Sequence, residues 1–473
     1  MSFTKPFRII LINAPFLEQE YVKFSEKWDT IEDEYLGVGI VHQILLDQGC
    51  EVIFLNSLDR EEINAVRLNF APSAILISVM QVSAPLVKQC VIHLRKDGFT
   101  GKILLGGWFA KLSWRMIFQT GWAVDAVCFS AAETTIPQWL HGEKNIPGLA
   151  TASDWKMHKD EEISTGLTSF PYTKPVRTPN RQTYAVETSR GCPHASCSFC
   201  SLTCLNRQTT RWQPIPLDVV KMQILELNNL YSTTSFAFVD DDLLGPLRLA
   251  EKRAEELAKM IFELPFKISF NCSISVKCAL NRHILKLLVD CGLRQLGIGF
   301  ESADESQLKR YHKAQTLEEN FIAAENIVAL GIKLIPGLIT FDPYSTPQSV
   351  QANLDFLFDQ LHHYELGKLT KRLHLIPGTP IVKQIAQDGL LIDDPLVPEY
   401  RFQYPGMAEI YDNFVDYTRQ VQLIIGCKRN QGESFRKLIS VHRKTIQTIL
   451  TGEYDANETT SILTGWKEKN GYS

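Results

Sequence analysis

The chain has 473 residues and a mass of 53.7 kDa, which is too long for one ordinary domain of about 100–200 residues. Hydrophobic residues make up 45% of it and charged residues 22%, which excludes a mostly disordered protein. The 49 Lys and Arg against 53 Asp and Glu give a net charge of -4, so no basic excess points to nucleic acid as a partner.

The amino terminus does not have the pattern of a secretion signal. Its apolar run, residues 9–12, is shorter than a signal core and ends at Asn13 and Pro15. No window approaches the roughly 18 consecutive apolar residues of a membrane span. The sequence therefore predicts a soluble, cytoplasmic protein with no membrane partner.

The first 150 residues alternate short apolar runs with stretches of helical spacing. Such runs are typical of buried parallel strands, and we expect them at residues 7–12, 51–55, 74–78, 102–105 and 125–129. Five strands with helical crossovers predict a Rossmann-like, doubly wound parallel sheet in an amino-terminal domain, residues 1–150. Its ligands belong at the carboxyl ends of the strands.

A second strand–helix series follows a polar, proline-bearing linker at residues 151–180. We expect its strands at residues 184–188, 235–239, 267–270, 295–300, 333–339 and 371–375, with helices between them. Six such units suggest a β/α TIM-type barrel over residues 181–385, partial or closed, although an open sheet fits the pattern equally well. Residues 386–473 are predicted to be mostly helical. The predicted fold class is therefore α/β, except for the mostly helical residues 386–473.

Four of the 11 cysteines are crowded into thirteen residues, and the other seven are predicted to be single, buried, small side chains. Cys192, Cys197 and Cys200 have the spacing C-x4-C-x2-C on a loop directly after a predicted strand. Thiolates suit iron–sulfur clusters and zinc. Three of them can hold three corners of a four-iron cluster and leave the fourth iron open. The alternative is a structural zinc site completed by His194. Cys204 is expected to be a bystander, although it could close such a cluster.

This loop resembles the cluster loop of the radical S-adenosylmethionine (radical SAM) enzymes, which usually reads C-x3-C-x2-C with an aromatic residue before the last Cys. Phe199 matches that aromatic residue, and the spacing here has one residue more. The resemblance extends to residues 238–242, to the G-x-G-x-E-S segment at 297–302 and to the P-G-T-P segment at 377–380.

The resemblance implies a [4Fe-4S] cluster on the three cysteines and S-adenosylmethionine (SAM) bound at its open iron. It also implies that SAM contacts come from four further residues, Phe199, Asp241, Glu301 and Ser302. Relatives often carry Arg-x-Asp where this chain has residues 275–277, Ser-Val-Lys. This difference weakens any assignment of a cofactor contact to that segment.

The order of segments in the first 150 residues resembles the cobalamin-binding domain of one radical SAM subclass. That resemblance implies cobalamin contacts at Ser78, Gly106 and Gly107. The segment that supplies a histidine to cobalt in some cobalamin proteins is absent, and residues 13–33 contain no His. Any cobalamin bound here is therefore expected to lack a histidine ligand from that loop.

The family's chemistry gives the expected function. Reductive cleavage of SAM yields methionine and a 5'-deoxyadenosyl radical, and with cobalamin the favoured outcome is methyl transfer to an unactivated carbon. The alternatives are a cobalamin-independent radical SAM enzyme that catalyses a rearrangement, an oxidation or C–C or C–S bond formation, and a zinc-stabilised, non-enzymatic binding module. The expected partners are a small-molecule or peptide substrate and an electron donor such as flavodoxin or ferredoxin.

Overall fold

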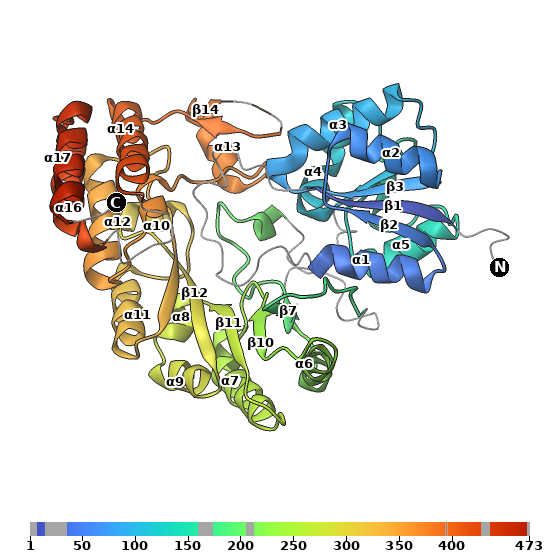
Figure 1. Cartoon of the computed structure of the whole chain (residues 1–473), viewed down its shortest axis with the longest axis horizontal. Helices are drawn as coiled ribbons and strands as arrows, with labels where there is room; N and C mark the ends of the chain where they lie inside the picture. Colours follow the sequence, from blue (N-terminus) through green and yellow to red (C-terminus); the bar gives the residue numbers. More distant parts are fainter. Residues whose placement is uncertain are drawn as a thin grey trace.

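The computed structural model describes residues 7–14, 36–158, 174–204, 212–392, 394, 396–426 and 436–470. Figure 1 shows two α/β units at opposite ends of the long axis of the molecule, with the carboxyl-terminal helices lying against the second unit. Within the described part of the chain, no helix is both long and apolar enough to cross a membrane.

The first unit is built on a six-stranded sheet with the order β2-β1-β3-β4-β5-β6. All five predicted strands are present and parallel, and they are joined by an antiparallel sixth strand that the sequence analysis missed. A strand of three residues is too short to produce a periodic signal. The strands are β1 (Arg8–Asn13), β2 (Glu51–Leu55), β3 (Ala74–Ser78), β4 (Lys102–Gly106), β5 (Ala126–Cys128) and β6 (Leu149–Thr151).

Helices cover both faces of this sheet, as expected of a doubly wound fold (Figure 1). One apolar cluster joins one sheet face to α2 (Arg60–Phe70), α3 (Ala84–Lys96) and α4 (Gly107–Gln119). A second cluster joins the other face to α1 (Leu36–Asp47) and α5 (Ala132–Leu140). In the predicted linker, the Val176 amide donates to the Gly39 carbonyl of α1 at 2.9 Å; linker residues 159–173 lie outside the described part.

The second unit has a five-stranded parallel sheet with the order β13-β12-β11-β10-β7. Successive long strands are neighbours throughout, which is the order of a β/α barrel and not that of a doubly wound sheet. The strands are β7 (Tyr184–Val186), β10 (Ser235–Phe238), β11 (Ser269–Ile274), β12 (Leu293–Glu301) and β13 (Lys333–Leu338). The helices are α6 (Leu217–Tyr231), α7 (Leu247–Phe262), α8 (Val276–Ala279), α9 (Arg282–Asp290), α10 (Glu305–Arg310), α11 (Leu317–Ala329) and α12 (Pro347–Asp355).

The predicted sixth barrel strand, residues 371–375, is wrong. This segment forms one isolated bridge, between Phe341 and Arg372. Pro336 in the edge strand β13 has no N–H to donate, and its carbonyl accepts a hydrogen bond of 2.7 Å from the Lys368 ammonium. The barrel is therefore partial.

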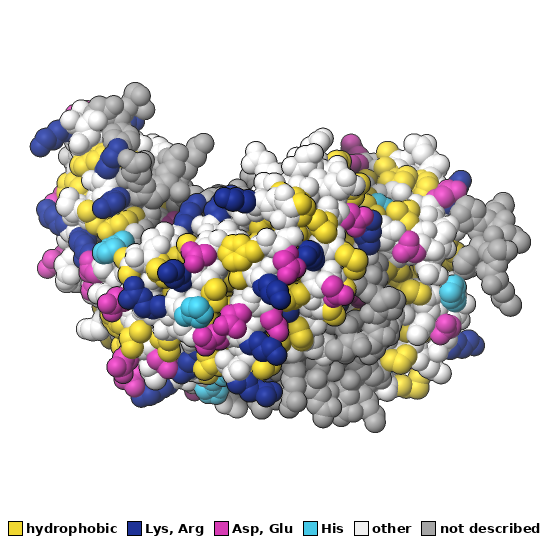
Figure 2. All heavy atoms as spheres, turned by 90° about the horizontal axis from the view of Figure 1, so that it is seen from below, with side chains coloured by type: hydrophobic (Ala, Val, Ile, Leu, Met, Phe, Trp, Pro, Cys, Tyr) yellow, Lys and Arg dark blue, Asp and Glu magenta, His cyan; other side chains and the backbone are white. Residues whose placement is uncertain are grey.

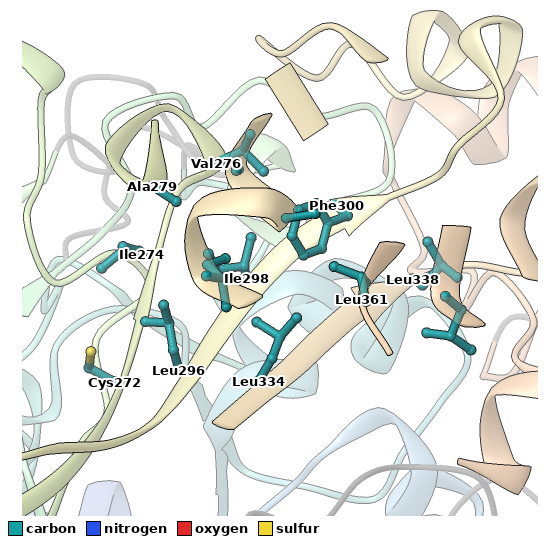
Figure 3. Packing of buried hydrophobic residues seen from close by; sticks show 14 of the residues in the cluster. Cys272, Ile274, Val276, Ala279, Leu296, Ile298, Phe300, Leu334, Leu338 and Leu361 are labelled. Atoms are coloured by element: carbon teal, nitrogen blue, oxygen red, sulfur yellow. The ribbon is translucent and has the colours of Figure 1, made fainter. Parts of the chain in front are cut away.

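Side chains alternate along the barrel strands between an apolar core and a cavity. Figure 3 shows Leu296, Ile298 and Phe300 of β12 within the buried core, next to residues of β11 and β13. The alternate positions line the cavity and are mostly small: Ser273, Gly297, Gly299, Ile335 and Gly337. Small inward residues leave space inside the partial barrel, which a filled TIM barrel does not have.

The carboxyl-terminal region is mostly helical, as predicted, with one two-stranded antiparallel ladder. Phe414, Tyr417 and Ile446 of its helices belong to the same apolar cluster as the barrel core. The elements are α13 (Pro380–Gln387), β14 (Leu391–Ile392), β15 (Glu399–Tyr400), α14 (Met407–Gln420), α16 (Ile439–Thr451) and α17 (Ala456–Lys469).

Two further expectations concern single residues and surface charge. Six of the seven single cysteines are buried as predicted, and Cys427 lies outside the described residues. On the molecular face seen in Figure 2, acidic and basic side chains are interspersed.

Candidate active site

Two cavities lie at the carboxyl edges of the two sheets. The barrel cavity, about 890 Å³, is lined by the Cys192–Cys200 loop and by the ends of β10 to β13. The inter-sheet cavity, about 510 Å³, is lined by the ends of β3 and β4 and also by Glu187 and Arg190 from the barrel side. The carboxyl edges of the two sheets therefore face each other. Asp241 lines both cavities, so the cavities meet at that side chain.

The cysteine loop begins where β8 (Ser189–Arg190) ends, and all three predicted ligands line the barrel cavity. Gly191 has φ +85°, a left-handed conformation that allows the chain to turn into the loop. The far side of the loop is anchored by the Ser198 amide, which donates to the Tyr311 carbonyl at 2.9 Å, and by the Ser198 hydroxyl, which donates to the Arg310 carbonyl at 2.7 Å.

Burial raises the pKa of each of the three thiols, that of Cys197 to about 12, while the nearby Lys313 ammonium opposes this rise at Cys197. Backbone amides of residues 194 and 195 also favour the Cys192 thiolate, and the Leu202 amide favours that of Cys200. The loop therefore supplies hydrogen-bond donors to sulfur, as iron–sulfur sites do.

The donor atoms do not form a zinc site. Zn–S bonds of about 2.3 Å place tetrahedral ligands roughly 3.8 Å apart. Among the described residues, three or more metal-type donors lie within 4.8 Å of one another only at the exposed set Glu251, Glu255 and His283. His194 instead bonds through Nε2 to the His312 carbonyl at 2.9 Å. The three thiols and His194 are therefore not gathered around the position of a single ion.

Cys204 is separate from the other three. It does not line the barrel cavity, and its thiol lies 3.9 Å from the Pro377 carbonyl. Burial raises the pKa of this thiol to about 11. This position agrees with the expectation of a bystander.

Glu301 lies at a distortion at the end of β12. It has φ +65°, and the pairing with β13 shifts register between Gly299 and Glu301. A left-handed non-glycine residue at a bulge is costly and is typical of functional positions. The carboxylate lines the barrel cavity and forms an ion pair of 3.0 Å with Lys313.

Gly299 makes room for this ion pair. A Cβ at position 299 would lie 2.3 Å from Glu301 Oε1 and 3.1 Å from the Lys313 ammonium. Burial alone would lower the pKa of Lys313, but the nearby Glu301 carboxylate and Cys197 thiol hold this pKa above its ordinary value. The G-x-G-x-E-S segment thus places one charged pair beside the cysteine loop.

Phe199 and Ser302 have different surroundings. Phe199 lines the barrel cavity and packs edge-on against Tyr311 at 5.0 Å. Ser302 is fully buried, and its hydroxyl oxygen lies 2.6 Å from Gln307 Oε1 and 3.0 Å from Asn353 Oδ1, either of which can accept its one proton. It does not line either cavity, so the structure gives it a supporting place beneath Glu301.

Of the three consecutive aspartates, only Asp241 faces both cavities. Asp240 is turned inward, accepts from the Ser189 hydroxyl at 2.7 Å, and has a pKa raised to about 7 by burial. Asp242 accepts the amides of Leu244 and Gly245, both at 3.1 Å, and so caps the following turn.

The predicted cobalamin contacts Ser78, Gly106 and Gly107 all line the inter-sheet cavity. A Cβ at Gly106 would meet nothing within 4 Å, whereas one at Gly107 would lie 2.8 Å from the Val79 backbone. Gly107 therefore serves the turn from strand to helix, and Gly106 leaves open space towards the cavity. None of the described residues that line this cavity is a histidine.

The sequence analysis missed a group of charged residues between the two sheets. The Arg190 guanidinium contacts Glu187 at 2.7 and 2.9 Å and Glu133 at 2.9 Å, and Glu133 follows β5 of the first sheet. Lys111 of α4 lines the same cavity, and burial lowers its pKa to about 8. The sequence signal that could have pointed to Glu133 was its position at the start of a helix that follows a strand of the doubly wound sheet, because ligands bind at that edge.

A second contact joins the first sheet to the wall of the barrel cavity. The Gln81 side-chain amide donates to the Leu375 carbonyl at 2.7 Å, and Gln81 Oε1 lies 3.1 Å from His374 Nε2. Burial, followed by the charge of Lys371, lowers the pKa of His374 to about 4. A neutral His374 therefore links the two units.

Comparison with known families agrees with this geometry. Residues 186–357 match the model of the Radical SAM superfamily. That range contains the cysteine loop, Asp241 and the Glu301–Lys313 pair. Residues 186–357 therefore have the sequence of a Radical SAM domain, and the solved structures whose fold the chain shares include cobalamin-dependent SAM radical enzymes.

Two curated relatives match parts of the chain. The 4'-phospho-dehydrooxetanocin synthase of Priestia megaterium is 29% identical over 195 residues, 37% of this chain and 26% of that protein. The hopanoid C-2 methylase of Rhodopseudomonas palustris is 24% identical over 215 residues, 44% of this chain and 39% of that protein. The chain thus matches less than half the length of these relatives.

Two solved structures share the fold over most of the chain. The cobalamin-dependent SAM radical enzyme OxsB, with aqua-cobalamin and SAM bound, gives a TM-score of 0.66 at 17% identity over 99% of this chain and 76% of that one. The radical SAM methyltransferase TsrM from Kitasatospora setae, with cobalamin and a [4Fe-4S] cluster bound, has a TM-score of 0.61 at 15% identity. That match covers 81% of this chain and 78% of that one.

Proposed function

We propose that this protein binds a [4Fe-4S] cluster, SAM and cobalamin, and transfers a methyl group to an unactivated carbon of its substrate. The observation that carries the proposal is that Asp241 lines both cavities, so that a ligand in one lies next to a ligand in the other. Two curated or solved relatives are themselves named as a methylase and a methyltransferase.

In this proposal Cys192, Cys197 and Cys200 hold the cluster and leave one iron for SAM. When bound, the cluster would pass one electron to SAM, whose cleavage gives methionine and a 5'-deoxyadenosyl radical that takes a hydrogen atom from the substrate, and cobalamin would carry the methyl group that the substrate carbon receives. A small-protein reductant supplies the electron. The protein binds and orients these groups and excludes water from them.

Glu301 and Lys313 provide the polar contacts for SAM. The Lys313 ammonium pairs with the Glu301 carboxylate at 3.0 Å, and Gly299 keeps the space that both side chains occupy. Phe199 offers an aromatic edge in the same cavity. Asp241 lines both cavities, and in this proposal it contacts SAM on one side and faces the inter-sheet cavity on the other.

The inter-sheet cavity fits a corrinoid in two respects. Its floor at Gly106 is open, so the backbone can approach a large ring. Its apolar part, lined by Leu11, Leu76 and Leu104, lies between the sheet and α1 and can receive a nonpolar substituent. No imidazole lines the described part, so we propose that cobalamin is held without a histidine ligand.

The substitution Gly106→Leu tests this site. Gly106 has φ −141°, which any residue adopts, so leucine fills the cavity without backbone strain. We expect the wild-type holoprotein to retain about one corrinoid per chain after desalting, and the variant to lose most of it while keeping its iron and sulfide. The Co(II) EPR spectrum of the wild type should show no coupling to an imidazole nitrogen.

Gly465→Leu is the matched control, because Gly465 lies in α17 and its Cβ would also meet nothing within 4 Å. It should retain corrinoid like the wild type. If the wild type itself retains no corrinoid after reconstitution, cobalamin-dependent methyl transfer is wrong and a cobalamin-independent radical SAM reaction takes its place.

A further inference from the structure

The loop after β3 of the first unit reaches the wall of the barrel cavity. Ser78 and Met80 of this loop line the inter-sheet cavity, whereas Gln81, the next residue, lines neither cavity. The Gln81 side-chain amide donates to the Leu375 carbonyl at 2.7 Å, and Gln81 Oε1 lies 3.1 Å from Nε2 of His374, which lines the barrel cavity. A glutamine of the first unit therefore holds a residue in the cavity wall of the second.

The backbone that carries Gln81 is itself fixed by hydrogen bonds. The Val79 amide donates to the Gly106 carbonyl at 2.8 Å, and the Met80 amide donates to the Ser83 hydroxyl at 3.2 Å. The Ser83 hydroxyl donates in turn to the Met80 carbonyl at 3.0 Å, and Ser83 is fully buried. A side chain on such an anchored loop can hold its partner in one place.

The two contacts of Gln81 determine which nitrogen of His374 carries the proton. The Leu375 carbonyl can only accept, so it faces the NH2 group of Gln81, and the amide oxygen then faces the imidazole. Because an amide oxygen can only accept as well, Nε2 of His374 is the protonated nitrogen. Gln81 thus selects one tautomer and one orientation of the ring.

The surroundings of His374 also favour its neutral form. Burial, followed by the charge of Lys371 in the same segment, lowers the pKa of His374 to about 4. From the first unit the ring meets the uncharged amide of Gln81, which offers no carboxylate to stabilise an imidazolium. The imidazole is therefore uncharged at neutral pH.

An uncharged ring in this wall suits the ligand that the cavity takes in the proposed function. SAM carries a positively charged sulfonium, and its cluster-binding neighbours, the three cysteines, line the same cavity as His374. A protonated His374 would place a like charge on the wall of a low-dielectric cavity and would raise the free energy of bound SAM.

We propose that Gln81 is a positioning residue of the first unit, which acts through His374 to keep a neutral imidazole in one orientation in the wall of the barrel cavity. The inference rests on the proposed function, because it takes the barrel cavity to be the site of SAM. It adds a role for the first unit, which then shapes the SAM site of the second unit as well as lining its own cavity.

Equilibrium binding of SAM to the cluster-loaded protein, in a double-mutant cycle, tests the proposal. Gln81→Met keeps the length of the side chain and removes both hydrogen bonds. We expect it to weaken SAM binding by about three- to tenfold in the wild-type background and to have no effect in the His374→Gln background. A residue that served only as a contact between the units would cause the same loss in both backgrounds.

Gln81→Glu gives a readout that a merely structural contact would not change. A carboxylate next to Nε2 favours the imidazolium, so it raises the pKa of His374. Because His374 lines the cavity and residue 81 does not, the added positive charge faces SAM. We expect the SAM affinity of this variant, relative to wild type, to fall by about threefold or more from about pH 8 to about pH 6. The fall should disappear in Gln81→Glu/His374→Gln.

Gln89→Met is the matched control, because Gln89 is exposed on α3 and lines neither cavity. It should bind SAM like the wild type, and iron and sulfide content shows that each variant still assembles the cluster. An unchanged SAM affinity in Gln81→Met, or an equal loss in both backgrounds, overturns the proposal. So does a pH dependence of Gln81→Glu that persists without His374.

Failure of the proposed function gives a different result. A protein that binds SAM but forms no 5'-deoxyadenosine would lack radical SAM chemistry, and the cycle on SAM affinity would still report whether Gln81 acts through His374. Normal formation of 5'-deoxyadenosine with no coupling between Gln81 and His374 would overturn this inference alone.

Discussion

We expect the triple substitution of Cys192, Cys197 and Cys200 by alanine to abolish both cluster assembly and SAM cleavage. The three thiols are the soft ligands of the barrel cavity, and the structure offers no nearby replacement among the described residues, because Cys204 lies outside that cavity. Iron and sulfide content after anaerobic reconstitution, together with the cluster's visible absorption, measures the first effect. Formation of 5'-deoxyadenosine measures the second.

Cys204→Ala provides the control, and it should keep the iron, the sulfide and the SAM cleavage of the wild type. Circular dichroism of the triple variant separates loss of ligands from loss of fold. Iron and sulfide at wild-type levels in the folded triple variant would show that the cluster is bound elsewhere.

The second large effect is expected for Glu301→Gln. Glutamine keeps the shape of the side chain but removes the charge that pairs with Lys313 at 3.0 Å, leaving a buried ammonium without this partner. We expect SAM affinity to fall by about tenfold or more while the cluster remains assembled. Equilibrium binding of SAM to the cluster-loaded protein is the measurement.

Gly299→Ala tests the same carboxylate from another direction. The added Cβ would lie 2.3 Å from Glu301 Oε1, so the carboxylate must move although its charge is unchanged. Glu305→Gln is the matched control, since Glu305 is an exposed residue on α10. SAM affinity that stays at the wild-type value in both Glu301→Gln and Gly299→Ala would remove Glu301 from the cofactor site.

Much of the fold could be predicted because buried parallel strands produce continuous apolar runs. All five parallel strands of the first sheet and five strands of the barrel follow such runs. The predicted sixth barrel strand has the same apolar pattern but pairs at only one bridge, between Phe341 and Arg372, since the edge strand β13 contains Pro336 and its carbonyl binds Lys368. The hydrogen bond from Lys368 to the Pro336 carbonyl joins residues 32 positions apart, so the local sequence gives no signal of it.

The candidate site was predicted where motif and strand end coincide. The three cysteines, Phe199, Asp241 and Glu301 were predicted in this way, and all of them line the barrel cavity. Ser302 shares the motif, but at the bulge its hydroxyl turns into the buried network with Gln307 and Asn353. A motif gives the order of residues, and the local backbone decides which of them face the cavity.

The residues between the two sheets could not be predicted in the same way. Glu133 and Arg190 are 57 positions apart and come from different units, Glu133 from α5 and Arg190 from β8, and their contact depends on how the two carboxyl edges face each other. The Gln81–His374 contact has the same origin, and its partners are 293 positions apart. Sequence periodicity describes each sheet by itself and does not report the packing of one sheet against the other.

The most direct test of the central claim is the product of SAM in the reduced, cluster-loaded protein. Anaerobic incubation with SAM and a low-potential reductant, followed by chromatography and mass spectrometry, should show 5'-deoxyadenosine and methionine from the wild type and neither from the triple cysteine variant. A wild-type protein that carries the cluster and binds SAM, yet forms no 5'-deoxyadenosine above the level of the variant, would contradict the assignment of this cavity as a radical SAM active site.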